Sequence, residues 1–263
     1  MTVTFFGNKL FWDTADFVSL PTLLPDGYSG QDRQTGETYF FSVANSAWQL
    51  TGTRITIDGS PQTINGNQDP ADTQTLSHTI ANNNNRLLVV CISVGDSVNS
   101  VIGASGVTYN GIPLTKAPGT TGNRSAWNSE IWTLIGPATG TNNIVVTWTT
   151  HANTTFIIGS YSLYNVDQIT GIGATNVTSG IDTTPTITIT PDEVDSWIID
   201  SVSSEQLAGS QTPGIFGWSI TPGSGIHGAS QYVTIPGGGL NTLSWTMTSG
   251  NWVSSGIEIL AVE

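Results

Sequence analysis

Charged side chains are scarce in this chain, and positively charged ones are the scarcest. Charged residues make up 10% of the 263 positions, against about 25% in an average soluble protein. There are 19 acidic and 6 basic residues, which give a formal net charge of -13. The basic residues are scattered and form no cluster: Lys9, Arg33, Arg54, Arg86, Lys116 and Arg124. Phosphate backbones are bound by concentrated Lys and Arg, so we expect no binding to nucleic acid or to an anionic membrane surface.

Cysteine and long apolar runs are also missing. Cys91 is the only cysteine, so no disulfide can form within the chain, and its apolar neighbours predict a buried, inert thiol. No apolar run reaches the roughly 20 residues that span a membrane, so we expect no membrane insertion.

The N-terminal residues lack the basic start and apolar stretch of a secretory signal. We therefore expect a protein made in the host cytoplasm. The polar residues are mainly Thr, Ser, Asn and Gly, a composition typical of β-rich proteins exposed outside cells or on particles. Virion proteins reconcile these two observations, since they assemble inside the host and meet the outside after lysis.

Short alternating runs broken by Gly, Pro and Asn fill the chain from Thr75 onward. In residues 184–190, Ile187 and Ile189 share one face while threonines share the other, which is the period of a half-buried strand. The pattern predicts an all-β fold, an antiparallel β-sandwich of jelly-roll type. Its predicted interior contains Cys91 and nine further residues: Leu88, Val90, Val146, Trp148, Ile187, Ile189, Ile199, Leu243 and Trp245.

Three segments follow from composition. Residues 1–50 are interpreted as an N-terminal anchor that ends in a hairpin over residues 37–50, with its turn at Asn45 and Ser46. Residues 51–74 are interpreted as a second hairpin, marked by Asp58-Gly59, followed by a polar linker. Residues 75–263 form the predicted sandwich. The anchor is rich in large apolar side chains, and we expect contact with another chain through Phe5, Phe6, Phe11, Trp12 and Phe17.

A worn internal repeat is suggested within the sandwich. An offset of 97 residues aligns Trp148 with Trp245 and Gly159 with Gly256. The order of features also recurs, because an apolar strand precedes a Gly-rich turn and a Trp-containing strand in each half. Two four-stranded halves would together make one jelly roll.

Candidate catalytic residues are few. Paired carboxylates could hydrolyse glycosides if two of them lay about 5 to 10 Å apart, and the acids on or beside predicted strands are Glu130, Asp200, Glu205 and Glu258. Outward-facing acids without a catalytic role are the favoured interpretation. The histidines, at positions 78, 151 and 227, show no metal-binding spacing, so they are interpreted as structural.

Metal and ligand sites have few candidates as well. Asn65, Asn67 and Asp69 have the spacing of a calcium loop, but Pro70 and Leu76 occupy the positions where an EF-hand requires Gly and Glu. We therefore predict no metal and no cofactor. Of the nine Trp residues, those beside predicted loops are the candidates for stacking against a sugar, and these are Trp127, Trp218 and Trp252.

Residues 75–263 resemble a β-sandwich module of phage structural proteins and bacterial surface proteins. The resemblance depends on Asn85-Arg-Leu-Leu-Val-Val, Val107-Thr-Tyr-Asn-Gly, Ser129-Glu-Ile-Trp, Tyr164-Asn-Val-Asp and Gly256-Ile-Glu-Ile-Leu. Residues 36–50 resemble short elements near the N-termini of phage head and tail proteins. These motifs are mainly strand and turn signals, and the resemblance implies no catalytic residues.

The leading hypothesis is a non-enzymatic virion protein, a phage capsid decoration or head-fibre protein attached through its N-terminal segment. Its expected partners are the major capsid protein or other virion proteins, and a homotrimer is expected by analogy with capsid three-fold sites and fibres. One alternative is a carbohydrate-binding receptor or adhesin module of a tail fibre, whose partner would be a host-surface glycan. A glycan-cleaving enzyme is the third hypothesis.

Overall fold

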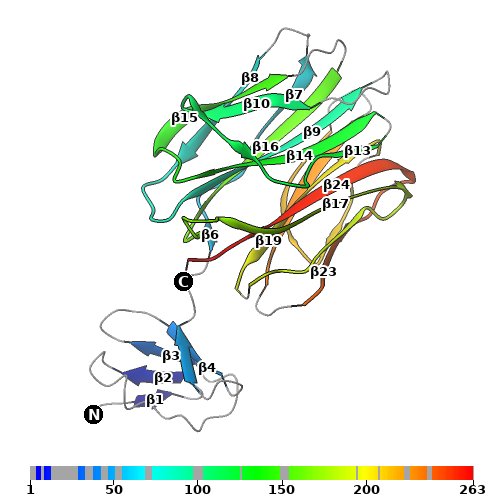
Figure 1. The fold of residues 1–263 in the computed structure, drawn as a ribbon. Coiled ribbons are helices and arrows are strands. Elements are labelled where there is room, and N and C mark those ends of the chain that lie inside the picture. Colours follow the sequence, from blue (N-terminus) through cyan, green and yellow to red (C-terminus); the bar gives the residue numbers. More distant parts are fainter. Residues whose placement is uncertain are drawn as a thin grey trace. The chain divides into compact units, whose positions relative to one another are not determined.

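A computed structural model describes the chain as two units, residues 1–54 and residues 55–263. The described residues are 4–6, 9–12, 29–32, 38–42, 47–50, 55–68, 73–96, 103–124, 126–148, 154–193, 195–206, 208–221, 226–235 and 239–262. All the secondary-structure elements within these ranges are β-strands, which confirms the all-β class (Figure 1). The units divide at residue 54, whereas the sequence predicted segment boundaries near residues 50 and 74.

The N-terminal unit, residues 1–54, contains one sheet with the strand order β1-β2-β3-β4-β5. Strands β2 and β3 are parallel, and the other neighbours are antiparallel. The predicted hairpin at residues 37–50 corresponds to the antiparallel pair of β4 and β5. Of the predicted anchor residues, Phe5 and Phe6 lie in β1 and Phe11 and Trp12 in β2, but their side chains and Phe17 lie outside the described residues. The strands are β1 (Thr4–Phe6), β2 (Lys9–Trp12), β3 (Ser29–Asp32), β4 (Thr38–Ser42) and β5 (Ala47–Leu50).

The first half of the sandwich unit, which comprises residues 55–263, is a complete jelly roll. Its outer sheet has the order β11-β10-β15-β8, and its inner sheet contains β14-β9-β16 with β7 paired to β16. The strands β7 to β10 alternate between the two sheets, as jelly-roll connectivity requires. The outer strands are β8 (Thr73–Ile80), β10 (Ala104–Tyr109), β11 (Ile112–Pro113) and β15 (Gly140–Trp148). The inner strands are β6 (Thr56–Ile57), β7 (Gln62–Gln68), β9 (Leu87–Asp96), β12 (Thr115–Lys116), β13 (Gly122–Arg124), β14 (Trp127–Ile135) and β16 (Thr154–Tyr164).

Two strands of this roll lie in the segment that was expected to be a hairpin and a linker. β6 and β7 flank the Asp58-Gly59 turn, but each pairs with β16 rather than with the other. Gly59 has a φ of 75°, so the turn expected there is present. It redirects the chain along the edge of the inner sheet instead of closing a two-stranded hairpin.

The second half repeats the first in its topology. Its inner sheet runs β17-β24-β19-β22-β21, and its outer sheet runs β18-β23-β20. The order β17-β24-β19-β22 matches β7-β16-β9-β14, and β18-β23-β20 matches β8-β15-β10. The inner strands are β17 (Ile172–Asp182), β19 (Trp197–Ser204), β21 (Ile215–Ile220), β22 (His227–Thr234) and β24 (Gly250–Ile259). The outer strands are β18 (Thr186–Ile189), β20 (Gln211–Thr212) and β23 (Asn241–Trp245).

The expected repeat is therefore one jelly roll in each half rather than two halves of a single roll, and the outer sheet of the second roll has three strands where that of the first has four. Trp148 on β15 and Trp245 on β23 occupy equivalent strands and are both buried. Gly159 and Gly256, which the offset also aligned, face different parts of the structure. A Cβ atom on Gly159 would meet Trp218 of the other roll, whereas one on Gly256 would meet Ile187 and Ile189 of the same roll.

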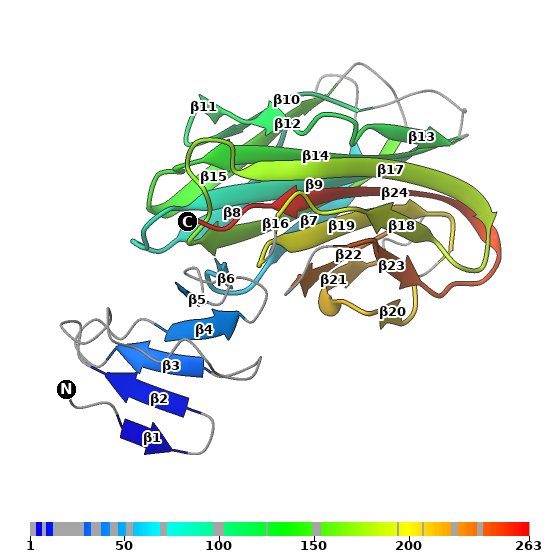
Figure 2. The ribbon, with the colours of Figure 1, turned by 60° about the horizontal axis from the view of Figure 1, so that its bottom comes forward.

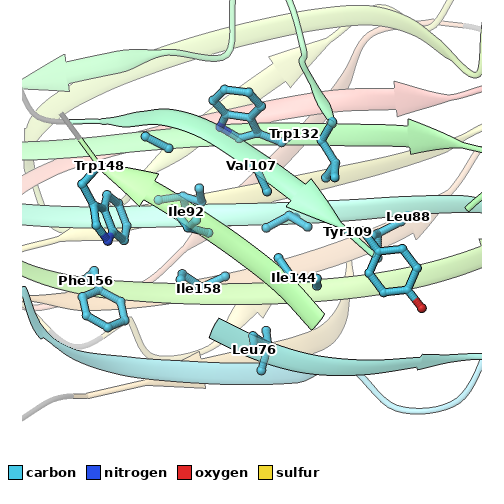
Figure 3. Packing of buried hydrophobic residues seen from close by; sticks show 14 of the residues in the cluster. Leu76, Leu88, Ile92, Val107, Tyr109, Trp132, Ile144, Trp148, Phe156 and Ile158 are labelled. Atoms are coloured by element: carbon cyan, nitrogen blue, oxygen red, sulfur yellow. The ribbon is translucent and has the colours of Figure 1, made fainter. Parts of the chain in front are cut away.

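The sandwich unit contains four sheets (Figure 2), and buried side chains cluster inside each roll and between the two inner sheets. The first roll encloses Leu88, Val146, Trp148 and Phe156 with their neighbours (Figure 3). A second cluster, which includes Cys91, Tyr161, Ile199 and Ile257, fills part of the space between the two inner sheets. Two smaller clusters lie inside the second roll, one around Trp245 and one around Leu243. All ten side chains predicted to form the interior are buried.

The inner sheets are covered on both faces. Every residue of β19, and every residue of β9 from Leu87 to Gly95, is buried. A strand buried on both sides has no solvent face, so its sequence is a continuous apolar run instead of an alternating one. The near-continuous apolar sequence around Cys91 follows from this position.

Serine side chains join the two rolls where the apolar cluster ends. Ser129 Oγ donates to the carbonyl oxygen of Ser201 at 2.9 Å, and Ser255 Oγ donates to that of Ser129 at 3.0 Å. Tyr161 donates to Ser230 Oγ at 2.7 Å. Cα atoms of β14 and β24 approach within 8 Å of each other, closer than the roughly 10 Å usual between stacked sheets. Small hydroxyl side chains permit this approach and satisfy backbone carbonyls across the interface.

Candidate functional site: the buried carboxylates

Glu130 is buried between the two sheets of the first roll. Lys116 Nζ lies 2.9 Å from its Oε1 and 4.8 Å from the centre of the Trp132 ring. The indole Nε1 of Trp132 donates to Glu130 Oε2 at 3.0 Å. The backbone N of Ala104 donates to the same oxygen at 3.4 Å, beside an irregularity in the pairing of β10 with β15. Glu130 therefore neutralises a lysine and accepts a backbone hydrogen bond where the strand register shifts.

Asp200 is fully buried inside the second roll. Its Oδ1 accepts a hydrogen bond from the backbone N of Gln231 at 3.1 Å. Its Oδ2 accepts from Gln231 Nε2 at 2.9 Å and from Trp245 Nε1 at 3.0 Å. Burial raises the pKa of Asp200 to about 7, although these three donors act to lower it. The carboxyl joins β19 to β22 and β23 and separates the two small apolar clusters of this roll.

Glu258 and Glu205 accept hydrogen bonds from backbone groups of neighbouring segments. Glu258 Oε2 accepts from the backbone N of Ala174 and of Asp192, both at 2.9 Å, and its Oε1 accepts from that of Glu193 at 3.1 Å. Ala174 lies where the pairing of β17 with β24 shifts register, so Glu258 bonds an N–H that the shift leaves free. Glu205 Oε2 accepts from both the backbone N and Nδ2 of Asn251 at 3.0 Å.

The four carboxylates are thus used within the fold, and the two best catalytic candidates are not brought together. Glu130 bonds to β10 in the first roll, whereas Glu258 bonds to Ala174 and Asp192 in the second. Glu130, Asp200 and Glu258 are each at most 1% exposed. A glycosidase needs two facing carboxylates with room for a sugar between them, and this arrangement does not provide it.

The histidines and Cys91 were also expected to have structural roles. His78 is buried and shares a 2.9 Å hydrogen bond between Nδ1 and Ser160 Oγ, and burial lowers its pKa to about 4. Burial raises the pKa of the Cys91 thiol to about 12, which agrees with the inert thiol predicted. His227 shares a 3.1 Å contact between Nδ1 and Thr221 Oγ1. His151 lies outside the described residues.

Only part of the segment with calcium-loop spacing lies within the described residues. Asn65 and Asn67 lie in β7, and Asn67 Oδ1 accepts a hydrogen bond from Thr155 Oγ1 at 3.0 Å. Asp69 and Asp72 lie outside the described residues. Within the ranges that the structure describes, no group of three His, Cys, Asp or Glu side chains could hold a metal ion.

Two of the three tryptophans expected to face a ligand are buried. Trp218 and Trp252 are 4% and 5% exposed. The Trp218 ring lies against Gly159 of the neighbouring roll, because that glycine leaves room for an indole between the inner sheets. Trp252 donates to Asp182 Oδ1 at 3.1 Å and lies against Gly180. Trp127 is half-buried beside the cluster between the rolls.

Sequence reasoning missed two aspartates that organise turns. Asp167 accepts hydrogen bonds from the backbone N of Ile169, Thr170 and Gly171 at 3.2, 2.8 and 3.3 Å, and these bonds lower its pKa. Asp182 accepts from the backbone N of Thr184 at 2.8 Å. An aspartate followed by polar residues and glycine is the signature of such turns, so the segment from Asp167 to Gly171 could have been identified.

Searches of protein-family models, curated proteins and solved structures find no match to this chain. Among the described residues, no helix is long and apolar enough to cross a membrane.

Proposed function

We propose that this chain is a non-enzymatic structural protein of a virus particle, a phage capsid decoration or head-fibre protein made in the host cytoplasm and displayed on the virion surface. The observation that carries this proposal is the use of Glu130, Asp200, Glu205 and Glu258 as internal hydrogen-bond acceptors. Groups committed to holding strands and turns are unsuited to proton transfer on a substrate. The jelly roll is a fold that viral capsid proteins use, but lectins use it too, so the fold alone does not decide the function.

The N-terminal unit is the proposed attachment segment. Its sequence places Phe5, Phe6, Phe11, Trp12 and Phe17 within thirteen positions. Aromatic side chains bury some 150 to 250 Å² each, and at about 25 cal/mol per Å² five of them could contribute roughly 20 kcal/mol before association costs. The proposed partner is the major capsid protein or another virion protein, and we propose a homotrimer as the assembled state.

Glycan binding by a tail-fibre module is the alternative. The burial of Trp218 and Trp252 gives it less support than the sequence did, and Trp127 alone remains as a partly exposed candidate platform. A host-surface glycan would be its ligand. Binding to a glycan array that is lost on Trp127→Ala would favour this function over the capsid protein.

The experiment that tests the proposal is localisation of the chain in purified virions. Quantitative mass spectrometry of the particles should find the chain in a fixed ratio to the major capsid protein. Imaging of the same particles should then place it at repeated positions on the capsid. Absence of the chain from the particles, when it is abundant in the lysate, would contradict the proposal.

A further inference from the structure

Three exposed isoleucines lie at one end of the sandwich unit. Ile112, Ile135 and Ile169 are 54%, 36% and 92% exposed. Ile135 pairs with Leu87 at the start of β9, and a Cβ atom on Gly171 would lie 2.9 Å from its Cδ1. Ile112 follows the turn from β10, where the backbone N of Asn110 donates to the carbonyl of Asn143. We name this region, with its three isoleucines, the isoleucine end.

The chain joins the sandwich unit at this same end. Thr56 pairs with Tyr164, the last residue of β16 before the turn that contains Ile169. Figure 2 shows β6 and β11 at the same end of the sandwich unit. Residues 51–54 can span at most about 18 Å between Leu50 and Ile55, since an extended chain covers up to about 3.6 Å per residue. The chain that leads from the N-terminal unit therefore enters the sandwich unit at the isoleucine end.

The backbone at Ile169 is held by hydrogen bonds, although its side chain is exposed. It lies in the turn in which Asp167 accepts three consecutive backbone N–H groups. An apolar side chain presented on an ordered turn loses little conformational entropy on binding. This arrangement favours a specific contact between Ile169 and a binding partner.

Charge at this end indicates the kind of partner. Beside the isoleucines, Arg86 donates to the carbonyl oxygens of Asn83 and Pro137, and Asp58 accepts from the backbone N of Ala81. On the second-roll side of the same end, Asp192 and Glu193 are exposed. Their place at this end follows from their backbone N–H groups, which donate to Glu258. Glu258 precedes Ile259, the partner of Ile172 at the start of β17. This end thus presents exposed isoleucines on the first-roll side and exposed acidic side chains on the second-roll side. A second copy would bring the same acids and its own charge of -13, so a different protein is the better complement.

We infer that the isoleucine end is a second docking surface for the virion protein to which residues 1–54 attach. The matching surface on that protein is an apolar patch flanked by basic residues. This inference rests on the proposed function and adds to it that the sandwich unit itself contacts the particle, in a fixed orientation with its isoleucine end toward the capsid.

The test uses the full-length chain and particles assembled without it. The double variant Ile135→Ser/Ile169→Ser is compared with Ile181→Ser, which changes an isoleucine that is 60% exposed at the opposite end of β17. Occupancy on the particles is measured by mass spectrometry over a range of protein concentrations. We expect the double variant to need about tenfold more protein for half occupancy, as the loss of a hot-spot contact implies, and Ile181→Ser to behave as wild type. Glu193→Lys should also bind more weakly.

Folding and self-association are checked on the same samples. Ile169→Ser alone changes a side chain that packs on little, so it should reproduce part of the loss with an unchanged unfolding temperature. Equal occupancy of the double variant and wild type overturns the inference while leaving the proposed function intact. A wild-type chain that does not bind particles overturns both. A change in sedimentation mass caused by Ile135→Ser/Ile169→Ser identifies a second copy as the occupant and overturns the assignment to a capsid partner.

Discussion

Trp148 and Trp245 occupy equivalent strands in the two jelly rolls but differ in what their indole nitrogens meet. Trp245 Nε1 donates to the buried carboxyl of Asp200 at 3.0 Å, whereas the buried Nε1 of Trp148 has no hydrogen-bond partner among the residues that the structure describes. The two rolls therefore share a topology, but the tryptophan at this strand position is hydrogen-bonded to a buried carboxyl only in the second roll.

The first prediction compares these two tryptophans. Trp245→Phe should lower the free energy of unfolding by about 2 kcal/mol more than Trp148→Phe, because it removes a donor to a buried carboxyl in addition to ring volume. Denaturant unfolding at pH 8, where Asp200 is ionised for most of the time, measures the difference. Equal losses in the two variants would show that the bond to Asp200 contributes no stability.

A second prediction follows from the titration of Asp200. Its pKa is raised from 3.8 to about 7 in the folded chain, so the folded state holds a proton that the unfolded state releases between these values. Stability should then fall as pH rises from about 4 to 7, by up to about 4 kcal/mol at 1.36 kcal/mol per pKa unit. Denaturant unfolding of wild type and Asp200→Asn across this pH range measures the effect. The stability of the variant relative to wild type should increase as pH rises.

His78 should act in the opposite direction. Its pKa is lowered from 6.5 to about 4 by burial, so the unfolded state binds the proton more readily within this window. Its contribution is present above pH 6.5 and is lost as pH falls toward 4, by up to about 3 kcal/mol. Relative to wild type, His78→Gln should gain stability as pH is lowered from 6.5 to 4. A relative stability that stays constant with pH would contradict this assignment.

Glu258 should be required for the fold of the second roll rather than for catalysis. Glu258→Gln keeps the shape but removes the charge that accepts three backbone N–H groups, and we expect a loss of about 2 to 3 kcal/mol. Glu205→Gln, whose carboxylate is only half-buried, should cost less. We expect the wild-type protein not to hydrolyse glycans. Hydrolysis that is lost in Glu130→Gln or Glu258→Gln would support an enzyme instead.

The N-terminal unit gives the last prediction. Removal of residues 1–54 should leave residues 55–263 soluble and folded, because they form a separate compact unit with its own apolar clusters. Circular dichroism and thermal unfolding should resemble those of the sandwich in the full chain, while occupancy on virions should be lost. A truncated chain that still reaches full occupancy would place the principal anchor in the sandwich unit.

The sequence by itself determined the strands and the interior. Alternation identified Ile187 and Ile189, and the apolar run around Cys91 identified a strand, since both signals depend only on neighbouring residues. It also indicated the repeat through Trp148 and Trp245. These features are local, so they can be identified from the sequence without knowing which strands pair.

Only the tertiary structure decided how strands and side chains combine across long separations. The assignment of β7 to the sandwich depends on pairing with β16, about 90 residues later. Trp218 was expected at the surface but is buried, because Gly159 of the other roll provides the space for its ring. Glu130 and Glu258 were expected to face outward, yet both are buried and accept hydrogen bonds from backbone N–H groups beside register shifts in other strands. Whether a carboxylate meets a substrate or a backbone N–H depends on those contacts, which local sequence does not encode.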